Sequence, residues 1–129
     1  MNTQITLASK SQTRSRLLTN AKIKFKTVDH GVDEDEIKLS MAENSPEEIV
    51  TKLAEIKALK ASISNDGLVI GSDQGLDLNG KLVNKAKNFD EAHEQLKSMS
   101  GKEHTLITTT VVAKAVSYTH LTLPTIYSV

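Results

Sequence analysis

A short apolar run that ends in a carboxylate constrains this chain most. Residues 68–70 read Leu-Val-Ile, and Gly71 and Ser72 then lead directly into Asp73. Such a run predicts a buried strand, and ligands of α/β folds gather where strands end. An ionised carboxylate at that place needs a cationic partner, a metal ion or water, because burying it alone is costly. Asp73 is therefore a candidate for chemistry, although a strand followed by an Asx turn explains these residues equally well.

The composition narrows the class of protein. The 129 residues suffice for one domain with a real core. Sixteen basic residues balance sixteen acidic ones, which argues against nucleic acid or an anionic membrane as a partner bound by bulk charge. Aromatic residues make up 3% and Cys is absent, so we expect neither base-stacking platforms nor thiolate sites. The N-terminus lacks a signal-peptide pattern and no apolar run has membrane-spanning length, so we expect a cytoplasmic protein.

Predicted strands and helices alternate along the chain. A capped helix follows the strand at 5–8, and a helix start at 45–48 combines a Ser cap, a Pro and two Glu residues. Residues 29–36 form an acidic stretch that we expect to be a loop, and Asn79-Gly80 predicts a tight hairpin. Further strands are expected at 24–28, 68–73 and 106–113. The alternation predicts an α/β or mixed α+β fold.

Apolar spacing assigns a buried face to each of two predicted helices. In the helix that starts at Ser45, the expected stripe consists of Ile49, Leu53, Ile56 and Ile63, with Leu59 beside it. Lys57 lies off this stripe and would by itself be a solvated lysine. A later helix carries a stripe of Phe89, Ala92, Leu96 and Met99, and Ser100-Gly101 ends it.

The last segment differs in amino-acid composition from the rest of the chain. Residues 116–125 read V-S-Y-T-H-L-T-L-P-T, which resembles the translation, in one frame, of a widely used transposon-based sequencing adapter. We therefore expect the natural domain to occupy residues 1–115 and residues 116–129 to be a sequencing artefact. The alternative is an ordinary Thr-rich strand interrupted by Pro124.

Several candidate residues fit the binding of a phosphate. Ser9 and Arg14 lie where a strand leads into a helix, and helix N-termini bind phosphates through unpaired N–H groups. Arg14 can add a bidentate contact. The acidic run 33–36 could supply a metal ligand, although a solvated loop is the commoner explanation. Lys85 follows the hairpin and could reach back toward Asp73.

Taken together, these residues are what a Mg-bound triphosphate requires. Mg²⁺ prefers one or two carboxylates plus phosphate oxygens, cations offset the charge that develops on a leaving phosphate, and a carboxylate can deprotonate the attacking water. Other chemistries fit poorly: the four His residues lack zinc-site spacing. Phosphate-loop, dinucleotide-binding and nucleophile-elbow motifs are also absent.

Six segments, in order, resemble the Maf family of nucleotide pyrophosphatases, from Ile5 to about Ala113. They are Leu7-Ala8-Ser9-Lys10-Ser11 with Arg14, Val32-Asp33-Glu34, Leu53-Ala54-Glu55-Ile56-Lys57-Ala58, Ile70-Gly71-Ser72-Asp73-Gln74, Asn79-Gly80 with Lys85, and Ala92 to His104-Thr105.

The resemblance implies an elongated, inosine-triphosphatase-like mixed sheet flanked by helices with a central cleft, incomplete here at its C-terminus. It implies hydrolysis of nucleoside triphosphates to the monophosphate and pyrophosphate with a divalent cation, Mg²⁺ or Mn²⁺, and it leaves a homodimer open. The roles that it implies are Asp73 as the base that activates water and as a metal ligand, Glu34 at the metal, and Ser9, Arg14, Lys57 and Lys85 at the phosphates. Gln74 resembles the branch that acts on 7-methyl-GTP.

The chain also departs from the family pattern. Thr13 replaces the first Arg of a pair, Ala86 replaces a Pro, and Gly75 is expected to weaken the strand beside Asp73. The family's C-terminal part is missing, so we expect this chain by itself to be unstable or inactive, without a cooperative melt. Two other functions stay open: a non-catalytic regulator of septum formation on the same fold, and a Mg-nucleotide-binding module without turnover.

Overall fold

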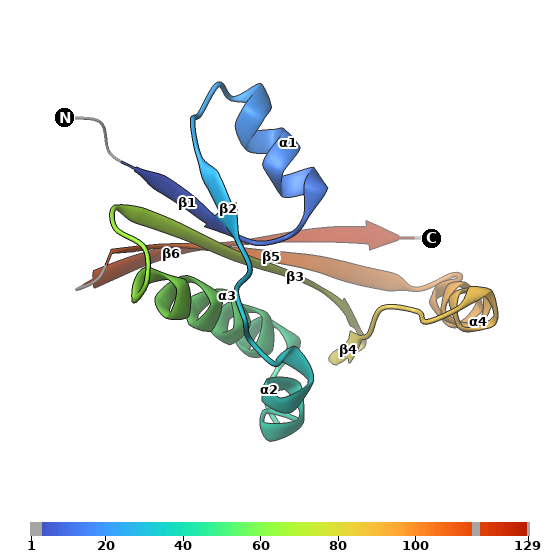
Figure 1. The fold of residues 1–129 in the computed structure, drawn as a ribbon. Coiled ribbons are helices and arrows are strands. Elements are labelled where there is room, and N and C mark those ends of the chain that lie inside the picture. Colours follow the sequence, from blue (N-terminus) through green and yellow to red (C-terminus); the bar gives the residue numbers. More distant parts are fainter. Residues whose placement is uncertain (1–3, 115–116, 129) are drawn as a thin grey trace.

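The computed structural model describes residues 4–114 and 117–128 and is built on one mixed sheet. The strand order is β2-β1-β3-β5-β6, with β4 paired to β3 off this path (Figure 1). β1 is parallel to β2 and β3, whereas the β3–β4, β3–β5 and β5–β6 pairs are antiparallel. This arrangement confirms the predicted α/β class. The strands are β1 (Ile5–Ala8), β2 (Lys26–Val28), β3 (Leu68–Leu78), β4 (Lys81–Val83), β5 (Glu103–Lys114) and β6 (Ser117–Ser128).

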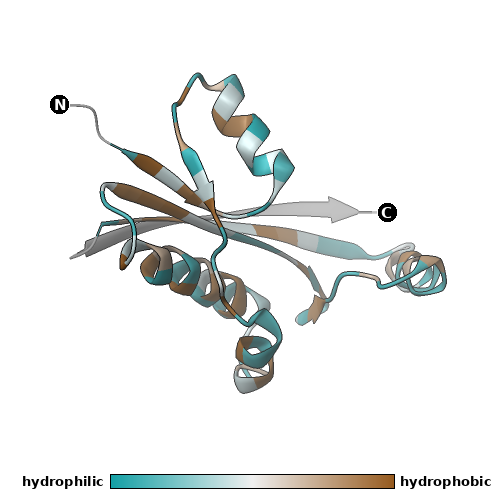
Figure 2. Cartoon of the chain, viewed as in Figure 1, coloured by the Kyte–Doolittle hydropathy of each residue, from teal (hydrophilic) through white to brown (hydrophobic). Residues whose placement is uncertain are grey.

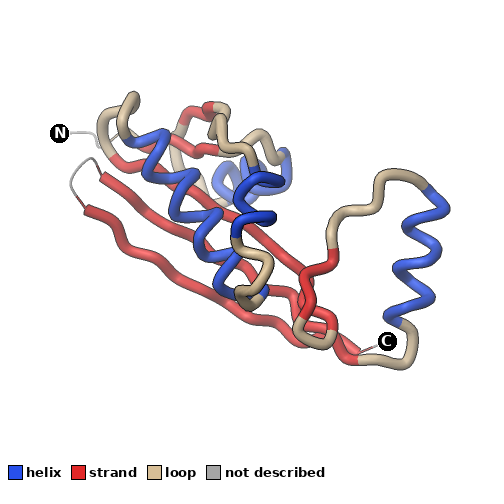
Figure 3. The backbone as a smooth tube through the Cα atoms, turned by 90° about the horizontal axis from the view of Figure 1, so that it is seen from below, coloured by secondary structure: helices blue, strands red, loops and turns tan. Residues whose placement is uncertain are grey.

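The long strands and the helices give the molecule an elongated shape. Figure 3 shows the long strands side by side, with α3 (Pro46–Ser62) lying along one face. α1 (Gln12–Asn20) lies on the other side of the sheet, and α4 (Phe89–Met99) lies beyond its far end (Figure 1). The expected elongated mixed sheet flanked by helices is therefore observed. None of the helices among the described residues is both long and apolar enough to cross a membrane.

One edge of β3 carries two short partners with a gap between them. β1 pairs with residues 68–70 and β4 with residues 76–78, whereas β5 pairs along the whole opposite edge from Val69 to Asp77. Residues 71–75 therefore have no described strand beside them on the β1 side. Asp73 lies in the middle of this gap.

Helix α3 begins as predicted, but its buried face matches the predicted stripe only in part. The Ser45 hydroxyl accepts from the Glu48 N–H at 3.2 Å and the Glu48 carboxylate accepts in return, which completes a capping box. In the first half of the helix the buried face carries Ile49, Val50 and Leu53, and further along it carries alanines and also Lys57, which is 3% exposed. Leu59 and Ile63 are instead exposed, Ile63 by 85%. The predicted burial of Ile49 and Leu53 is confirmed and Ile56 is half-buried, whereas the predictions for Leu59, Ile63 and Lys57 were wrong.

The alanines of α3 explain this orientation. A Cβ at Gly71 would lie 2.6 Å from Ala54 O and from Ala58 N, so the helix backbone approaches the strand closely. Small residues at these positions permit such an approach, and this orientation of the helix leaves Leu59 and Ile63 exposed. Ala54 and Ala58 pack with Val111 of β5 in this part of the core.

Two further expectations are corrected near β3. The predicted loop 29–36 ends early, because α2 (Glu34–Ser40) begins there with Asp33 as its cap and three acidic residues in its first turn. Gly75 does not interrupt β3. A Cβ there would lie 2.5 Å from Val50 Cγ2 and 2.7 Å from Leu82 Cδ1, so this glycine makes room for α3 and β4.

The remaining elements form where they were predicted, but the predicted buried face of one helix is wrong. Asn79 and Gly80 adopt positive φ angles of 53° and 82° and close the β3–β4 hairpin. α4 forms with Asn88 as its cap, but its apolar stripe is not buried, since Phe89 is 93% and Leu96 65% exposed. Figure 2 shows that α4 carries both hydrophobic and hydrophilic residues. The backbone of β6 pairs along β5 from Lys114 to Glu103. The assignment of residues 116–129 to a sequencing adapter stays a prediction.

Candidate functional site

A lysine joins two carboxylates at the centre of the site. Lys57 Nζ lies 2.5 Å from Glu34 Oε1 and 3.0 Å from Asp73 Oδ1. Lys57 and Asp73 are buried and Glu34 is half-buried. The three residues come from α3, α2 and β3, so the fold brings together side chains that are far apart in the sequence.

The pleat of β3 and the close approach of α3 produce this contact. Side chains alternate between the two faces of a strand, so Asp73 lies on the same face as Gly71 and Gly75. The two glycines let α3 pack against that face. Lys57, one residue before Ala58, then reaches Asp73 along the sheet.

The predicted phosphate-binding segment is held by its own hydrogen bonds. Ser11 caps α1, its hydroxyl accepting from the Arg14 N–H at 3.2 Å. The buried Ser9 Oγ accepts from the Ser11 N–H and from Arg14 Nη1, both at 3.1 Å. Because its lone pairs are engaged, the Ser9 hydroxyl proton remains to donate to a ligand oxygen.

A single cavity of about 750 Å³ contains every predicted site residue. It is lined by residues from the ends of β1 and β2, from α2 and α3, and from the β3–β4 hairpin with the segment that follows it. The predicted residues on its wall are Ser9, Arg14, Glu34, Lys57, Asp73, Gln74 and Lys85. Their roles stay predictions, but the sequence does place them around one space.

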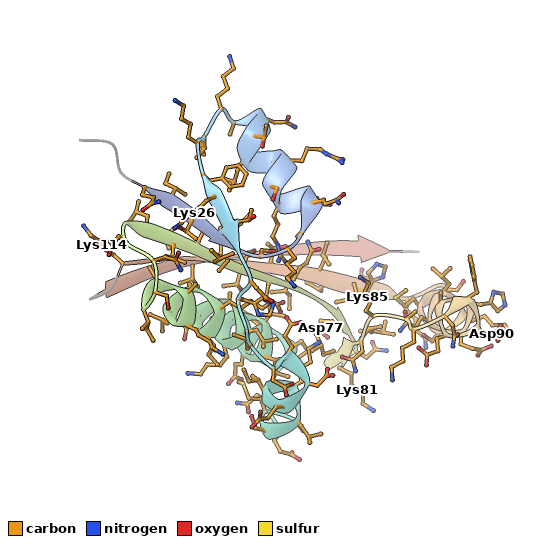
Figure 4. The ribbon with its side chains drawn as sticks, in the orientation of Figure 1. Lys26, Asp77, Lys81, Lys85, Asp90 and Lys114 are labelled. Atoms are coloured by element: carbon orange, nitrogen blue, oxygen red, sulfur yellow. The ribbon has the colours of Figure 1, made fainter. Side chains whose placement is uncertain are left out.

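Two of these residues, Gln74 and Lys85, lie outside the Glu34–Lys57–Asp73 ion-pair cluster. Lys85 is exposed after β4, and within residues 4–114 it forms no ion pair with Asp73 (Figure 4). Gln74 donates from Nε2 to Thr108 Oγ1 at 2.9 Å. It also lines a second cavity of about 370 Å³ between α1 and the sheet, with Arg14 and Ile70 among its other walls. The two cavities therefore share Ser11, Arg14 and Gln74.

The two carboxylates on Lys57 differ in their proton affinity. Burial raises the pKa of Asp73 above its usual value, and the charge and hydrogen bond of Lys57 offset this only in part. Burial acts in the same direction on Glu34, but the hydrogen bond and charge of Lys57 outweigh it, and the pKa of Glu34 is lowered. Carboxylates whose environments separate their pKa values in this way are suited to different roles.

The site can hold a divalent cation only together with a ligand. No group of three or more His, Asp or Glu side chains suited to a metal ion occurs within residues 4–114. Glu34 and Asp73 are two carboxylates that share one lysine, which leaves one net negative charge. A Mg²⁺-type ion bound by one or two carboxylates completes its shell with phosphate oxygens and water, so these residues fit such an ion with a phosphate ligand.

Sequence reasoning missed His30. It follows β2 and lines the same cavity as Lys57 and Asp73. Its position four residues before Glu34 is the available signal, whereas zinc-site spacing does not single it out. Burial, followed by the charge of Lys57, lowers the pKa of His30.

Comparisons with known proteins agree with the resemblance in the sequence. The family model described as "Maf-like protein" matches residues 4–126. A nucleoside triphosphate pyrophosphatase from Caulobacter vibrioides is 46% identical over 114 residues, which cover 87% of this chain and 57% of the relative. A 7-methyl-GTP pyrophosphatase from Brucella abortus is 38% identical, with 95% of this chain and 67% of the relative covered. The chain thus spans between about half and two thirds of these relatives' length.

A solved structure shares the fold. The dITP/XTP pyrophosphatase from Mycobacterium abscessus has a TM-score of 0.53 and 14% identity, covering 97% of this chain and 72% of that one. At this identity the likeness concerns the fold alone. It agrees with the expected inosine-triphosphatase-like sheet.

Proposed function

The chain belongs to the Maf family, and from this premise we propose that the protein hydrolyses nucleoside triphosphates to the monophosphate and pyrophosphate. The observation that carries the proposal is the Glu34–Lys57–Asp73 cluster on the wall of a cavity large enough for a nucleotide. The relatives' names support the same activity.

In the proposed reaction Asp73 accepts a proton from the attacking water. Its raised pKa makes the carboxylate a stronger base than an exposed aspartate. Lys57 donates a hydrogen bond to this carboxylate at 3.0 Å. Its positive charge favours the ionised form of Asp73 in spite of the burial. The water then attacks the α-phosphorus, the α–β anhydride bond breaks, and pyrophosphate leaves.

The remaining residues would bind the triphosphate. Ser9 donates its hydroxyl proton, and Arg14, fixed by its bond to Ser9, supplies a guanidinium. Lys85 at the far wall would neutralise the pyrophosphate end. These cations oppose the charge that develops on the leaving group.

We propose that Glu34 and Asp73 hold a divalent cation, Mg²⁺ or Mn²⁺, together with phosphate oxygens. When bound, the cation supplies positive charge next to the scissile phosphate. The choice between the two metals, a homodimer and a cytoplasmic location stay predictions.

We propose 7-methyl-GTP as the preferred substrate. Gln74 donates its amide proton to Thr108, which leaves Oε1 as an acceptor at the boundary of the two cavities. The guanine edge offers N–H donors to such an acceptor. The Brucella relative carries this activity in its name.

Asp73→Asn tests the proposed activity in protein expressed from the complete reading frame of the source locus. We expect pyrophosphate release by the wild type, greatest with 7-methyl-GTP, and none above background by the variant with its fold intact by circular dichroism. No turnover by the wild type would favour a non-catalytic regulator, whereas equal turnover by both proteins would exclude Asp73 as the base. The present chain is assayed beside it, because we expect it to be inactive by itself.

A further inference from the structure

His30 lies at a fixed position on the wall of the cavity. It lies between β2 and α2 and lines the cavity that Lys57 and Asp73 also line. The ring is half-buried. Lys57, Glu34, Asp29 and Asp73 are the charged groups that act on it.

The short loop around His30 is anchored on both sides. Asp29 Oδ1 accepts from the Gly31 N–H at 3.0 Å, and Asp29 Oδ2 pairs with Lys10 Nζ at 3.1 Å. Lys60 donates to the Gly31 carbonyl. Gly31 has a φ of +64°, which favours glycine. These contacts define where the imidazole lies before any ligand binds.

A backbone hydrogen bond fixes the tautomer of the ring. His30 Nδ1 accepts from the Val32 N–H at 2.9 Å. A nitrogen that accepts carries no proton, so in the neutral ring the proton is on Nε2. Protonating Nδ1 would place two donors against each other and break this bond. The neutral form is the stable one, in agreement with the lowered pKa.

We propose that His30 is a substrate-binding residue whose Nε2–H donates a hydrogen bond to a phosphate oxygen of the nucleoside triphosphate. The proposal rests on the proposed function of this site. Nδ1 is engaged with the loop, so the opposite edge of the ring is the one left for a ligand. Within residues 4–114 no partner for Nε2 is recorded.

The fixed tautomer also limits what His30 can do. A neutral imidazole with its single proton on Nε2 is a hydrogen-bond donor and a very weak acid. It therefore does not protonate the leaving pyrophosphate. His30 contributes a neutral hydrogen-bond donor beside the cationic side chains of the site. Its hydrogen bond to a charged phosphate oxygen is stronger than one to a neutral acceptor.

Two substitutions separate this role from a structural one. In His30→Asn the side-chain oxygen can still accept from the Val32 N–H, as in an Asx turn, but nothing reaches the position of Nε2. In His30→Gln the longer amide places an N–H donor near the Nε2 position and weakens the turn. We expect His30→Asn to lower kcat/KM for the triphosphate about tenfold or more. His30→Gln should stay within about threefold of the wild type.

The reverse ranking, with His30→Gln impaired and His30→Asn normal, would show that the ring only supports its loop and would overturn the proposal. Equal loss in both variants, or no loss in either, would overturn it as well. The thermal midpoints of both variants are measured alongside, and a fall in activity that tracks a fall in midpoint also counts against it.

A binding measurement separates the failure of this proposal from that of the proposed function. Calorimetric titration with inorganic tripolyphosphate and Mg²⁺ needs no turnover. If the wild type binds tripolyphosphate but hydrolyses no nucleotide, the proposed function fails, while weaker binding by His30→Asn than by His30→Gln still supports the donor. If the wild type neither binds nor hydrolyses, both proposals fail.

Discussion

The ammonium group of Lys57 lies 3.0 Å from the carboxylate of Asp73, on the face of β3 where two glycines let α3 pack closely. The same ammonium pairs with Glu34 at 2.5 Å. One buried cation thus serves two carboxylates with opposite pKa shifts. This arrangement makes the site sensitive to charge, to packing and to pH, in ways that can be measured separately.

Replacing Asp73 by Asn should abolish turnover without unfolding the protein. Asn has nearly the same shape but cannot accept the proton of water, and general-base catalysis contributes about 10²- to 10⁴-fold. We expect kcat to fall by at least about a hundredfold. Pyrophosphate release measures this, with Asp66→Asn on the loop before β3 as a surface control. Retention of more than a tenth of the activity would exclude Asp73 as the base.

Replacing Lys57 by Met should destabilise the protein strongly. The change leaves Asp73 without its cation in a buried place, and breaking a buried pair costs about 3–5 kcal/mol. Asp73→Asn in the same chain should recover part of that loss, because the orphaned charge is then gone. Urea unfolding of the two single variants and the double variant measures the coupling.

Lys52→Met is the matched control for this cycle, since Lys52 is exposed on the same helix. We expect its free energy of unfolding to lie within about 0.5 kcal/mol of the wild type. A similar loss in Lys52→Met and Lys57→Met would show that the ion pairs of Lys57 are not the cause.

The close approach of α3 to β3 predicts unequal effects for two glycine substitutions. A Cβ at Gly71 meets helix backbone at 2.6 Å, whereas a Cβ at Gly75 meets only the ends of the Val50 and Leu82 side chains. Side chains can rotate away and a helix backbone cannot. We expect Gly71→Ala to cost about 1–3 kcal/mol of stability and Gly75→Ala to cost less, as measured by thermal unfolding. The opposite order would mean that α3 does not lie as close as described.

The raised pKa of Asp73 predicts a pH dependence of stability. A carboxyl group whose folded pKa is raised stabilises the folded state fully below its unfolded pKa, near 3.8, and loses this contribution as pH rises through the folded pKa. The opposite holds for Glu34, whose pKa is lowered. Relative to Asp73→Asn, the wild type should therefore lose stability as pH rises above about 4.

Urea unfolding of both proteins between pH 3.5 and about 7, in buffer with a chelator, measures this difference. The Glu34 contribution is present in both proteins, so it largely cancels. A difference that stays flat with pH, or that grows in favour of the wild type, would contradict the raised pKa.

The sequence predicted those features that local rules control. The capping box at Ser45, the Asn79-Gly80 turn and the cap of α1 each depend on a few neighbouring residues, and each was found. The motif residues were also placed around one cavity. The face of α3 was predicted only in its first half, because counting large apolar residues ignores how closely a helix can approach glycines in another strand. His30 was missed because its importance comes from a tautomer and from partners on other elements.

The gap at residues 71–75 has a dynamic consequence. Asp73 lies on a stretch of β3 that is paired along one edge only, by β5, and is covered from behind by α3. Partial unfolding of α3 would therefore break the Lys57–Asp73 ion pair and uncover Asp73, while the paired ends of β3 could stay intact. The order of the site then depends on a single helix. A bound nucleotide that contacts both sides of the gap should oppose this local unfolding. Its binding should therefore slow amide hydrogen exchange in α3 as well as in β3.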